Sequence, residues 1–428
     1  MKNYESYQHS GLDWLGEIPS HWEVKKLKQV AESVQTGFTP STDEPKFYEE
    51  GTVDWFAPSD FGNRLVVKEA KKKITSFAIE SGNARYFKPN SVLLVGIGAT
   101  LGKVGLCETA CSANQQINAI GFKPNYDPHF ATYYLKAISQ IIVSSANAST
   151  LPILNQTGTK ELYCVCPPLP EQRAIAAYLD RKTAQLDTLL AQKEALLQKL
   201  HQKRQALINE AVTQGLNPEA PRKASGVAWL GHVPAHWEVK KLKYVASLNS
   251  GNTINAESIE PEGAYPVLGG NGLRGYTTTF THDGHFALIG RQGALCGNIN
   301  YGNGQFFATE HALVVSLKGE YETVWLGELL RIMNLGQYSQ AAAQPGLSAE
   351  RLMQLSIPVP PLAEQRSIVN FIEAKANKIN DAATAIHIQI QTLKAYRQSL
   401  ITEVVTGKVD VRPTKPAAPE ADLPLWMQ

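Results

Sequence analysis

The chain has 428 residues, enough for two to four domains of about 150 residues each. Its 43% hydrophobic and 19% charged residues are close to globular averages and exclude a wholly disordered or fibrous chain. The net charge of +2 excludes a surface that is basic throughout. Because no apolar run approaches the ~18 residues of a membrane span, we expect a cytoplasmic protein without a membrane segment.

The chain opens with a segment that occurs twice. Residues 10–28 read Ser-Gly-x-x-Trp-Leu-Gly-x-x-Pro-x-His-Trp-Glu-Val-Lys-Lys-Leu-Lys, and residues 225–243 match the same pattern at an offset of 215. A repeat of this length indicates a duplicated architecture. The two His-Trp pairs have no metal-site or catalytic-triad pattern around them, so we interpret each as a packed entry segment with Trp as its anchor.

The next stretch, residues 30–165, is predicted to consist mostly of strands and loops. Short runs rich in Val, Leu, Phe and Trp, such as residues 53–58 and 91–96, are separated by Gly, Pro, Asn and Asp. This texture is typical of a small strand-rich domain.

A long helix is predicted next. Residues 171–214 contain neither Pro nor Gly, and Pro167 and Pro168 mark where the helix begins. Apolar residues recur with the 3.5-residue period of a coiled-coil seam. The predicted seam residues are Ile175, Leu179, Leu186, Leu189, Leu196, Leu200 and Leu207.

The second copy repeats this order. Strand-rich segments such as residues 265–276 and 285–294 precede Pro360 and Pro361, and residues 364–406 again lack Pro and Gly. The same register predicts a second seam at Ile368, Ile372, Ile379, Ile386, Leu393 and Leu400. The last residues, 408–428, are rich in Pro and Ala and are predicted to form a flexible tail.

These elements together predict an α+β protein with two strand-rich domains. The expected boundaries are 1–166 and 216–359 for the strand-rich domains, and 167–215 and 360–407 for the long helices. A lone amphipathic helix would leave its apolar stripe in water, so the two helices are expected to pair as an antiparallel coiled coil. A pseudo-two-fold axis would then relate two heads on one rod.

Side chains that suit contact with DNA gather in the loops of both strand-rich halves. Arg pairs bidentately with guanine, and Asn or Gln with adenine, whereas Lys contacts phosphates without reading sequence. The candidate base-reading residues are Asn114, Gln115, Asn271, Arg274, Arg291 and Gln292. The candidate phosphate contacts are Lys25, Lys26, Lys28, Lys71, Lys72, Lys73, Lys103, Lys240, Lys241 and Lys243.

No catalytic, metal or cofactor site is predicted in this chain. The five cysteines include no C-x2-C pair, which disfavours a zinc site. The turn at residues 98–104 has three residues between its glycines and a Val after its Lys, whereas a phosphate-binding loop needs four and a Ser or Thr. Asp54, Glu69 and Lys71 only faintly resemble a nuclease metal site.

The duplicated opening, the strand-rich halves and the two Pro-Pro-Leu-x-Glu-Gln-Arg helices resemble the specificity subunit of type I restriction-modification systems, over essentially the whole chain. The resemblance implies two target-recognition domains that read an asymmetric bipartite site in double-stranded DNA, across a fixed unspecific spacer. It also implies two methyltransferase subunits, which use S-adenosylmethionine, and two restriction subunits, which use ATP and Mg²⁺. The chain itself would not be an enzyme.

Three alternatives remain open from the sequence. The chain could belong to a related system that methylates without restricting, which only its gene neighbours would distinguish. A coiled-coil adaptor would bind no duplex even beside a methyltransferase. An enzyme would lose activity, but not binding, when Asp54 or Glu69 is changed.

Overall fold

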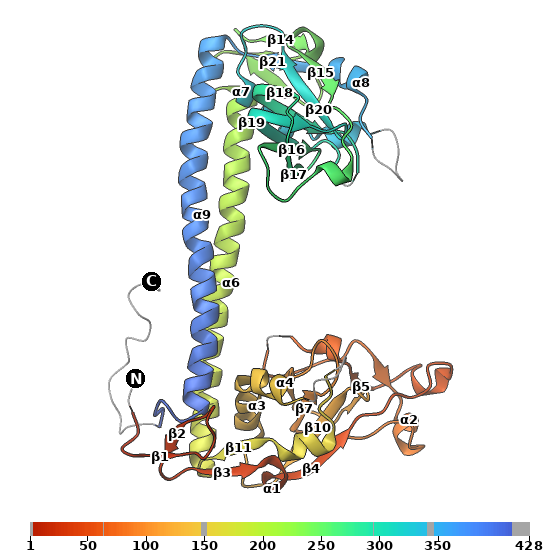
Figure 1. Cartoon of the computed structure of the whole chain (residues 1–428), viewed down its shortest axis with the longest axis vertical. Coiled ribbons are helices and arrows are strands. Elements are labelled where there is room, and N and C mark those ends of the chain that lie inside the picture. The colour runs from red at the N-terminus through yellow and green to blue at the C-terminus, as the bar shows by residue number, and fades with distance from the viewer. Residues whose placement is uncertain (1–2, 63, 147–151, 294, 340–345, 413–428) are drawn as a thin grey trace. The chain divides into compact units, whose positions relative to one another are not determined.

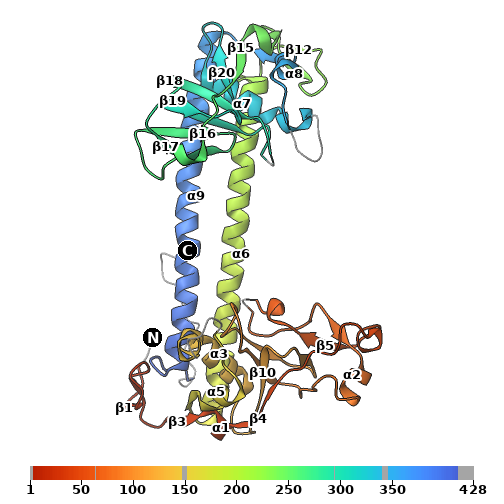
Figure 2. The same ribbon diagram turned by 45° about the vertical axis from the view of Figure 1, so that its right-hand side comes forward.

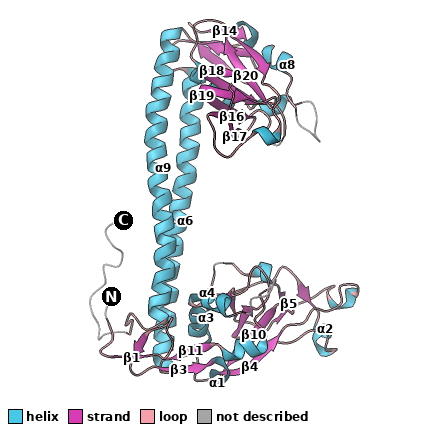
Figure 3. Cartoon of the chain, in the orientation of Figure 1, coloured by secondary structure: helices cyan, strands magenta, loops and turns pink. Residues whose placement is uncertain are grey.

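The structure is a computed structural model that describes residues 3–62, 64–146, 152–293, 295–339 and 346–412. The chain forms two compact units: unit 1 comprises residues 1–193 and 388–428, and unit 2 comprises residues 194–387. Each unit holds one strand-rich domain and parts of both long helices, as Figure 3 shows by colour. The expected combination of strand-rich domains and long helices is confirmed.

Unit 1 is built on a central antiparallel sheet in the order β4-β10-β7-β8, beside a sheet in the order β6-β5-β9 and the two-stranded sheets β1-β2 and β11-β3. The strands of the two larger sheets are β4 Ala31–Thr36, β5 Val53–Phe56, β6 Lys73–Ile74, β7 Ser91–Val95, β8 Val104–Cys107, β9 Ser112–Ala113 and β10 Ile117–Phe122. The remaining strands are β1 Tyr7–His9, β2 Glu17–Pro19, β3 Glu23–Lys26 and β11 Tyr163–Cys166. Short helices are α1 Leu27–Val30, α2 Ser76–Glu80, α3 Pro128–Ala137, α4 Ser139–Ser145 and α5 Gln156–Glu161, with 3₁₀ turns at Pro45–Phe47 and Pro58–Asp60.

Unit 2 repeats this plan. Its larger sheet has the order β15-β20-β18-β19-β16-β17, of which the first four strands correspond to β4-β10-β7-β8. The strands are β12 Arg222–Ala224, β13 His232–Pro234, β14 Glu238–Lys241, β15 Ala246–Ser250, β16 Tyr265–Gly269, β17 Gly272–Thr277, β18 His282–Gly290, β19 Ile299–Ala308, β20 Ala312–Leu317 and β21 Ser356–Val359. The helices are α7 Thr323–Ile332 and α8 Ala349–Met353, with 3₁₀ turns at Leu242–Tyr244, Ala256–Ser258 and Leu335–Tyr338.

The two long helices are α6 Leu169–Gln214 and α9 Leu362–Val405. Within each unit they lie side by side and antiparallel (Figure 1); in unit 1, Asp187 of α6 pairs with Arg397 of α9 at 3.0 Å. Each helix starts just after its Pro-Pro pair and is followed by a glycine, Gly215 or Gly407, with a φ near +77° that ends helical geometry.

The buried stripe of α6 differs from the predicted seam. Ile175, Leu179 and Leu186 are buried. Farther along the helix, the buried residues are Leu190 and Ile208, each one residue after a predicted seam residue. The predicted neighbours Leu189, Leu200 and Leu207 are only half-buried, and Leu196 is 43% exposed. A straight helix has 3.6 residues per turn and drifts about 20° per heptad from a 3.5-residue repeat. The predicted seam of α6 is therefore wrong by one residue in the later part of the helix.

On α9 the predicted seam residues face inward. Ile368, Ile372, Ile386, Leu393 and Leu400 are buried, and Ile379 is half-buried. Ile390, which the 3.5-residue register omits, is buried as well. The predicted 3.5-residue register therefore holds along α9, and Ile390 is buried in addition.

The core of unit 2 joins the domain to the helices. Ile208 and Val212 of α6 and Ile368 and Ile372 of α9 belong to one apolar cluster with Trp325 of α7. In unit 1 the corresponding helix, α3, lies beside α6 (Figure 2). Both domains are thus attached to α6 through equivalent helices.

The expected flexible tail divides into two parts. Residues 413–428 lie outside the described residues. Residues 408–412 pack on unit 1: the Lys408 ammonium donates to the backbone oxygen of Leu15 at 3.0 Å, and Arg412 lies 5.0 Å from the ring of Tyr4. The described part of the tail therefore belongs to the folded unit.

Candidate nucleic-acid interface

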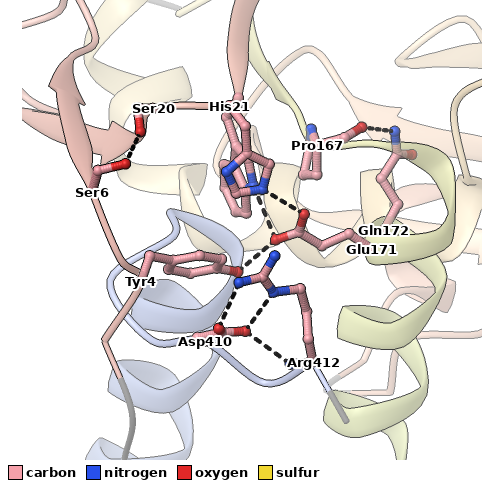
Figure 4. A network of polar contacts seen from close by, with 10 residues as sticks. Tyr4, Ser6, Ser20, His21, Pro167, Glu171, Gln172, Asp410 and Arg412 are labelled. Atoms are coloured by element: carbon pink, nitrogen blue, oxygen red, sulfur yellow. Dashed lines mark hydrogen bonds and ion pairs between the residues drawn. The ribbon is translucent and has the colours of Figure 1, made fainter. Parts of the chain in front are cut away.

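The repeated opening segment is held by the first turn of a long helix. In unit 1 the Glu171 carboxylate accepts hydrogen bonds from the Tyr4 hydroxyl at 2.8 Å and the Trp22 indole at 3.1 Å, and it pairs with His21 at 2.8 Å (Figure 4). The Trp22 side chain is fully buried. Burial, together with the bond to Glu171, raises the pKa of Tyr4 well above its usual value, so the hydroxyl remains a donor.

Unit 2 repeats these contacts at the start of α9. The Glu364 carboxylate pairs with His236 at 2.7 Å and accepts from the Trp237 indole at 2.9 Å. The carboxylate that each His-Trp pair contacts thus comes from far along the chain, and not from Glu23 or Glu238, which directly follow the pairs. The interpretation of a packed entry segment with Trp as its anchor is confirmed.

The Gln and Arg of the repeated Pro-Pro-Leu-x-Glu-Gln-Arg motif contact the start of the helix that follows each central sheet. The side-chain oxygen of Gln172 accepts from the backbone N–H of Asp127 at 2.7 Å, and that of Gln365 accepts from Glu322 at 3.0 Å. Asp127 and Glu322 are the residues that precede α3 and α7. Arg366 also pairs with Glu322 at 3.0 Å. The motif is therefore a structural junction between domain and helix.

A second set of polar contacts joins α3 to the long helices in unit 1. The Tyr133 hydroxyl donates to Asp180 of α6 at 2.8 Å. One turn along α3, burial lowers the pKa of Lys136 to about 8, and the nearby Arg397 adds to this effect. The Tyr133–Asp180 hydrogen bond therefore links α3 to α6 in unit 1.

Three loop segments meet at one edge of the central sheet in unit 1. Thr36 ends β4, and the next residues bond across to other loops: Phe38 N–H donates to Ala113 O at 2.9 Å, and Gly96 N–H to Gln116 O at 2.8 Å. We call residues 36–41, 96–103 and 113–116 the loop edge of unit 1. A Cβ at Gly37 would lie 2.2 Å from backbone oxygens, so only glycine fits there.

The side chains on this edge differ in accessibility. Gln115 is exposed, and its amide oxygen accepts from the Thr39 hydroxyl. Phe38, which sequence reasoning missed, is 47% exposed. Lys103 is exposed and donates to the backbone oxygen of Phe61 at 3.3 Å.

Asn114 does not have the accessibility that was predicted. It is 8% exposed, its side-chain oxygen accepts from Gln116 N–H at 3.0 Å, and its amide nitrogen donates to the Gln116 side chain at 3.1 Å. Asn114 therefore builds the turn, and Gln115 is the residue presented to solvent.

The loop edge of unit 2 lies at the equivalent strand ends. It comprises residues 250–252, 270–274, 290–297 and 308–311, of which residue 294 is outside the described chain. Arg291 N–H donates to His311 O at 2.8 Å, as Gly96 does to Gln116 in unit 1. The Arg291 guanidinium also donates to the Ser250 hydroxyl at 3.1 Å.

This edge surrounds an open pocket of about 360 Å³. Its lining includes the predicted residues Asn271, Arg274 and Gln292 and the unpredicted residues Leu273, Leu295 and His311. Leu273 is 56% and Leu295 is 49% exposed. The glycines at 269, 270 and 272 were the sequence signal for this close approach, because tight turns there bring the loops together.

In unit 1 the predicted phosphate contacts of the opening segment lie away from the loop edge. Lys25, Lys26 and Lys28 precede β4, whereas the loop edge follows its last residue, about 20 Å along a six-residue strand. Lys26 and Lys28 both pair with Glu161, at 2.5 and 2.6 Å, and hold its pKa at about 2.

In unit 2 the equivalent lysines also precede the central sheet. Lys240 pairs with Glu238, Lys241 donates to the Gln354 side chain at 3.2 Å, and Lys243 lies 5.2 Å from the ring of Tyr244. The structure does not bring these lysines together with the base-reading candidates.

The Lys71, Lys72 and Lys73 run borders the strand β5. Lys71 donates to the backbone oxygen of Ser59 at 3.4 Å, and Lys73 lies 3.9 Å from Asp54. Asp54 itself accepts from the backbone N–H of Ala70 at 3.0 Å, so its carboxylate has a structural role. Among the described residues no cluster of His, Cys, Asp or Glu is suited to a metal ion.

Two solved structures have the same fold as this chain. A chain of a solved type I R-M system structure superposes with a TM-score of 0.73 at 17% identity, covering 92% of this chain and 99% of that one. The HsdS subunit of Thermoanaerobacter tengcongensis superposes with a TM-score of 0.54 at 16% identity, covering 92% and 98%. These likenesses establish the two-domain fold.

The sequence comparisons give the family. The model of the type I restriction modification DNA specificity domain matches residues 19–199 and 234–392. The EcoprrI specificity subunit of Escherichia coli is 30% identical over 391 residues, which is 88% of this chain and 93% of that protein. The chain belongs to the family of type I restriction-modification specificity subunits, as the resemblance predicted. None of the helices in the described part of the chain has the length and hydrophobicity to cross a membrane.

Proposed function

We propose that this specificity subunit recognises an asymmetric bipartite site in double-stranded DNA, with the loop edge of each unit reading one half-site. The observation that carries the proposal is the position of the loop edges. Equivalent loops meet at equivalent strand ends in both units, yet they present different side chains, Gln115 in one and Arg274 with Gln292 in the other. Loops with the same backbone arrangement but different side chains are suited to two half-sites of different sequence.

The exposed groups match the edges of bases. Arg274 is suited to guanine, and Gln115, Asn271 and Gln292 are suited to adenine, because each of these side chains bonds bidentately in the major groove. Lys103, which belongs to the loop edge of unit 1, and the exposed Lys72 are the proposed phosphate contacts. The paired helices would fix the number of unspecific base pairs between the half-sites.

The chemistry of the complex is assigned to partners. Two methyltransferase subunits would supply adenine methylation from S-adenosylmethionine, and two restriction subunits would supply ATP- and Mg²⁺-dependent translocation and cleavage. In this proposal the chain holds these subunits on the site and contributes no catalytic group.

The test is to co-express the chain with its neighbouring methyltransferase gene and to map methylated adenines over the host genome. The expected motif has two short specific blocks around a fixed unspecific gap. A continuous motif, or no methylation from an intact complex, would contradict the proposal.

Point variants assign each block to a unit. Gln292→Ala is expected to relax one position in one block by roughly 1–3 kcal/mol of discrimination, and Gln115→Ala to relax the other block. Lys25→Ala, at a residue that lies away from the loop edge of its own unit, is the matched control and is expected to leave both blocks unchanged. Relaxation of both blocks by one variant would show that the units do not read separately.

A further inference from the structure

A turn of three residues stands at the same place in both loop edges. In unit 1 this turn joins β9 to β10 and comprises residues 114–116, and in unit 2 it joins β19 to β20 and comprises residues 309–311. Neither of the repeated sequence motifs extends into these turns. The correspondence between their residues therefore comes from the structure.

Three backbone hydrogen bonds recur around the two turns, all between 2.8 and 3.0 Å long. In unit 1 they run from the N–H to the oxygen in the pairs Gly37 to Ile117, Phe38 to Ala113 and Gly96 to Gln116. In unit 2 the same bonds, in the same order, join the pairs Gly251 to Ala312, Asn252 to Ala308 and Arg291 to His311. The middle residue of the turn is therefore Gln115 in unit 1 and Glu310 in unit 2.

The residues of the two turns have matching accessibility. The first residue is buried in both, because Asn114 is 8% and Thr309 is 0% exposed. The middle residue reaches solvent in both, since Gln115 is exposed and the side chain of Glu310 is 33% exposed. The position that presents an amide in unit 1 thus presents a carboxylate in unit 2, and sequence reasoning did not single out this carboxylate.

A carboxylate on an edge that faces DNA requires a donor. Double-stranded DNA carries one negative charge per ~1.7 Å of its axis, so Glu310 is repelled unless a base donates a hydrogen bond to it. The fold satisfies this carboxylate only in part. Oε1 lies 3.3 Å from Nε2 of His311, whereas Oε2 has no hydrogen-bond partner among the described residues. An acceptor left in this state costs stability, so the fold does not explain why a carboxylate is there.

The backbone of Glu310 is held in place. The Ser250 hydroxyl donates to the backbone oxygen of Glu310 at 3.1 Å, and the same hydroxyl accepts from the Arg291 guanidinium at 3.1 Å. The carboxylate therefore extends from a fixed point on the loop edge.

The hydrogen-bonding capacity of the two side chains selects different bases. The amide of Gln115 both donates and accepts, which suits N7 and N6 of adenine. The carboxylate of Glu310 only accepts, which suits the N4 amino group of cytosine and opposes the major-groove acceptors of guanine and thymine. Adenine also offers an amino group, but its N7 acceptor would face the second oxygen of the carboxylate.

We propose that Glu310 determines specificity in unit 2 by accepting a hydrogen bond from the N4 amino group of a cytosine, and that Gln115 reads an adenine from the equivalent position of unit 1. This inference rests on the proposed function for the contact between the loop edges and DNA. It adds the base that each position reads and a single substitution that converts one reading into the other.

The experiment exchanges the two side chains in the complex of the full chain with its neighbouring methyltransferase and maps the methylated adenines. Glu310→Gln is expected to change one position from a C·G to an A·T pair, in the block that Gln292→Ala relaxes. Gln115→Glu is expected to make the reverse change in the other block. Each exchange shifts the discrimination between the two base pairs by about 10- to 100-fold.

The control variant is Glu320→Gln. Glu320 is an exposed carboxylate beyond the end of β20 that is opposite the loop edge, so this variant is expected to leave both blocks unchanged.

A second measurement needs only the wild-type complex and decides the matter if Glu310→Gln does not fold. The cytosine of the site is replaced by 2-pyrimidinone, which lacks the amino group. The wild-type complex is expected to bind this duplex about 10-fold or more weakly than the natural one. A complex with Glu310→Ala is expected to bind the two duplexes equally.

Three results would overturn the inference. The block of unit 2 could contain no C·G pair that responds to Glu310→Gln, or the wild-type complex could bind both duplexes equally. Glu310→Gln could also lower the thermal midpoint and leave the motif unchanged, which would assign the carboxylate to its ion pair with His311 alone. A continuous motif from the wild-type complex would instead refute the proposed function itself, and this failure is distinguished because it appears without any substitution.

Discussion

At the scale of single residues, the buried carboxylates at the helix starts organise each unit. Glu171 satisfies the donors of Tyr4, His21 and Trp22, which come from the first 22 residues of the chain. A buried donor left without its acceptor costs about 1–3 kcal/mol, and more when several donors share one acceptor. The junction is therefore sensitive to a single change.

We expect Glu171→Ala to lower the free energy of unfolding by about 3 kcal/mol, because the hydroxyl of Tyr4 and the indole of Trp22 lose a common acceptor. Glu171→Gln is expected to cost less, since the amide oxygen still accepts. Denaturant unfolding measures both. Glu69→Ala, at a side chain that is 76% exposed, is the control and is expected to change stability by less than about 0.5 kcal/mol.

The partly buried Lys136 predicts a pH dependence of stability. Partial burial lowers its pKa from 10.5 to about 8, so below pH 8 the folded chain holds an unfavourable, partly desolvated charge. Between pH 8 and 10.5 the unfolded chain binds a proton that the folded chain does not, and stability therefore rises with pH in this window.

We expect Lys136→Met to stabilise the chain below pH 8 and to remove that rise. Unfolding curves of wild type and variant across pH 7 to 10.5 test this. Parallel pH profiles for the two proteins would contradict the prediction.

At the scale of elements, the long helices show how a repeat period decides which residues are buried. Leu186 is 2% exposed and Leu196 is 43% exposed, although both belong to the predicted seam. Leu186→Ala is expected to cost about 2–5 kcal/mol of stability, because it leaves a cavity, and Leu196→Ala less than about 0.5 kcal/mol. If thermal unfolding shows that the two variants lose equal stability, Leu196 is as buried as Leu186 and the 3.5-residue register is correct for α6.

At the scale of the whole molecule, the helix pair is proposed to set the spacer of the DNA site. Asp187 and Arg397 pair across the helices, so Ala191 and Leu393, four residues from each, lie at about the same level. Inserting four residues at both positions lengthens the pair by about 6 Å, the rise of about two base pairs.

The variant with both insertions is expected to methylate sites whose spacer is longer by one or two base pairs, with both half-sites unchanged. Mapping of methylated adenines is the measurement. Changed half-sites with the original spacer would refute this division of roles between helices and domains.

The sequence by itself determined the duplication, the strand-rich halves and the two long helices. These features are visible locally: a repeat needs only comparison of the chain with itself, and helix limits follow from Pro before and Gly after a run without either. The glycines at 269, 270 and 272 likewise mark the turns around Asn271 within the local sequence.

Only the tertiary structure decided which of those residues meet. The partners of His21 and His236 lie 150 and 128 residues away, and no spacing rule relates a buried carboxylate to a distant imidazole. The same holds for Asn114, which turns inward to Gln116, and for Leu196, which a small difference in period moves out of the seam. Sequence patterns report local conformation, whereas contacts depend on how the whole chain closes on itself.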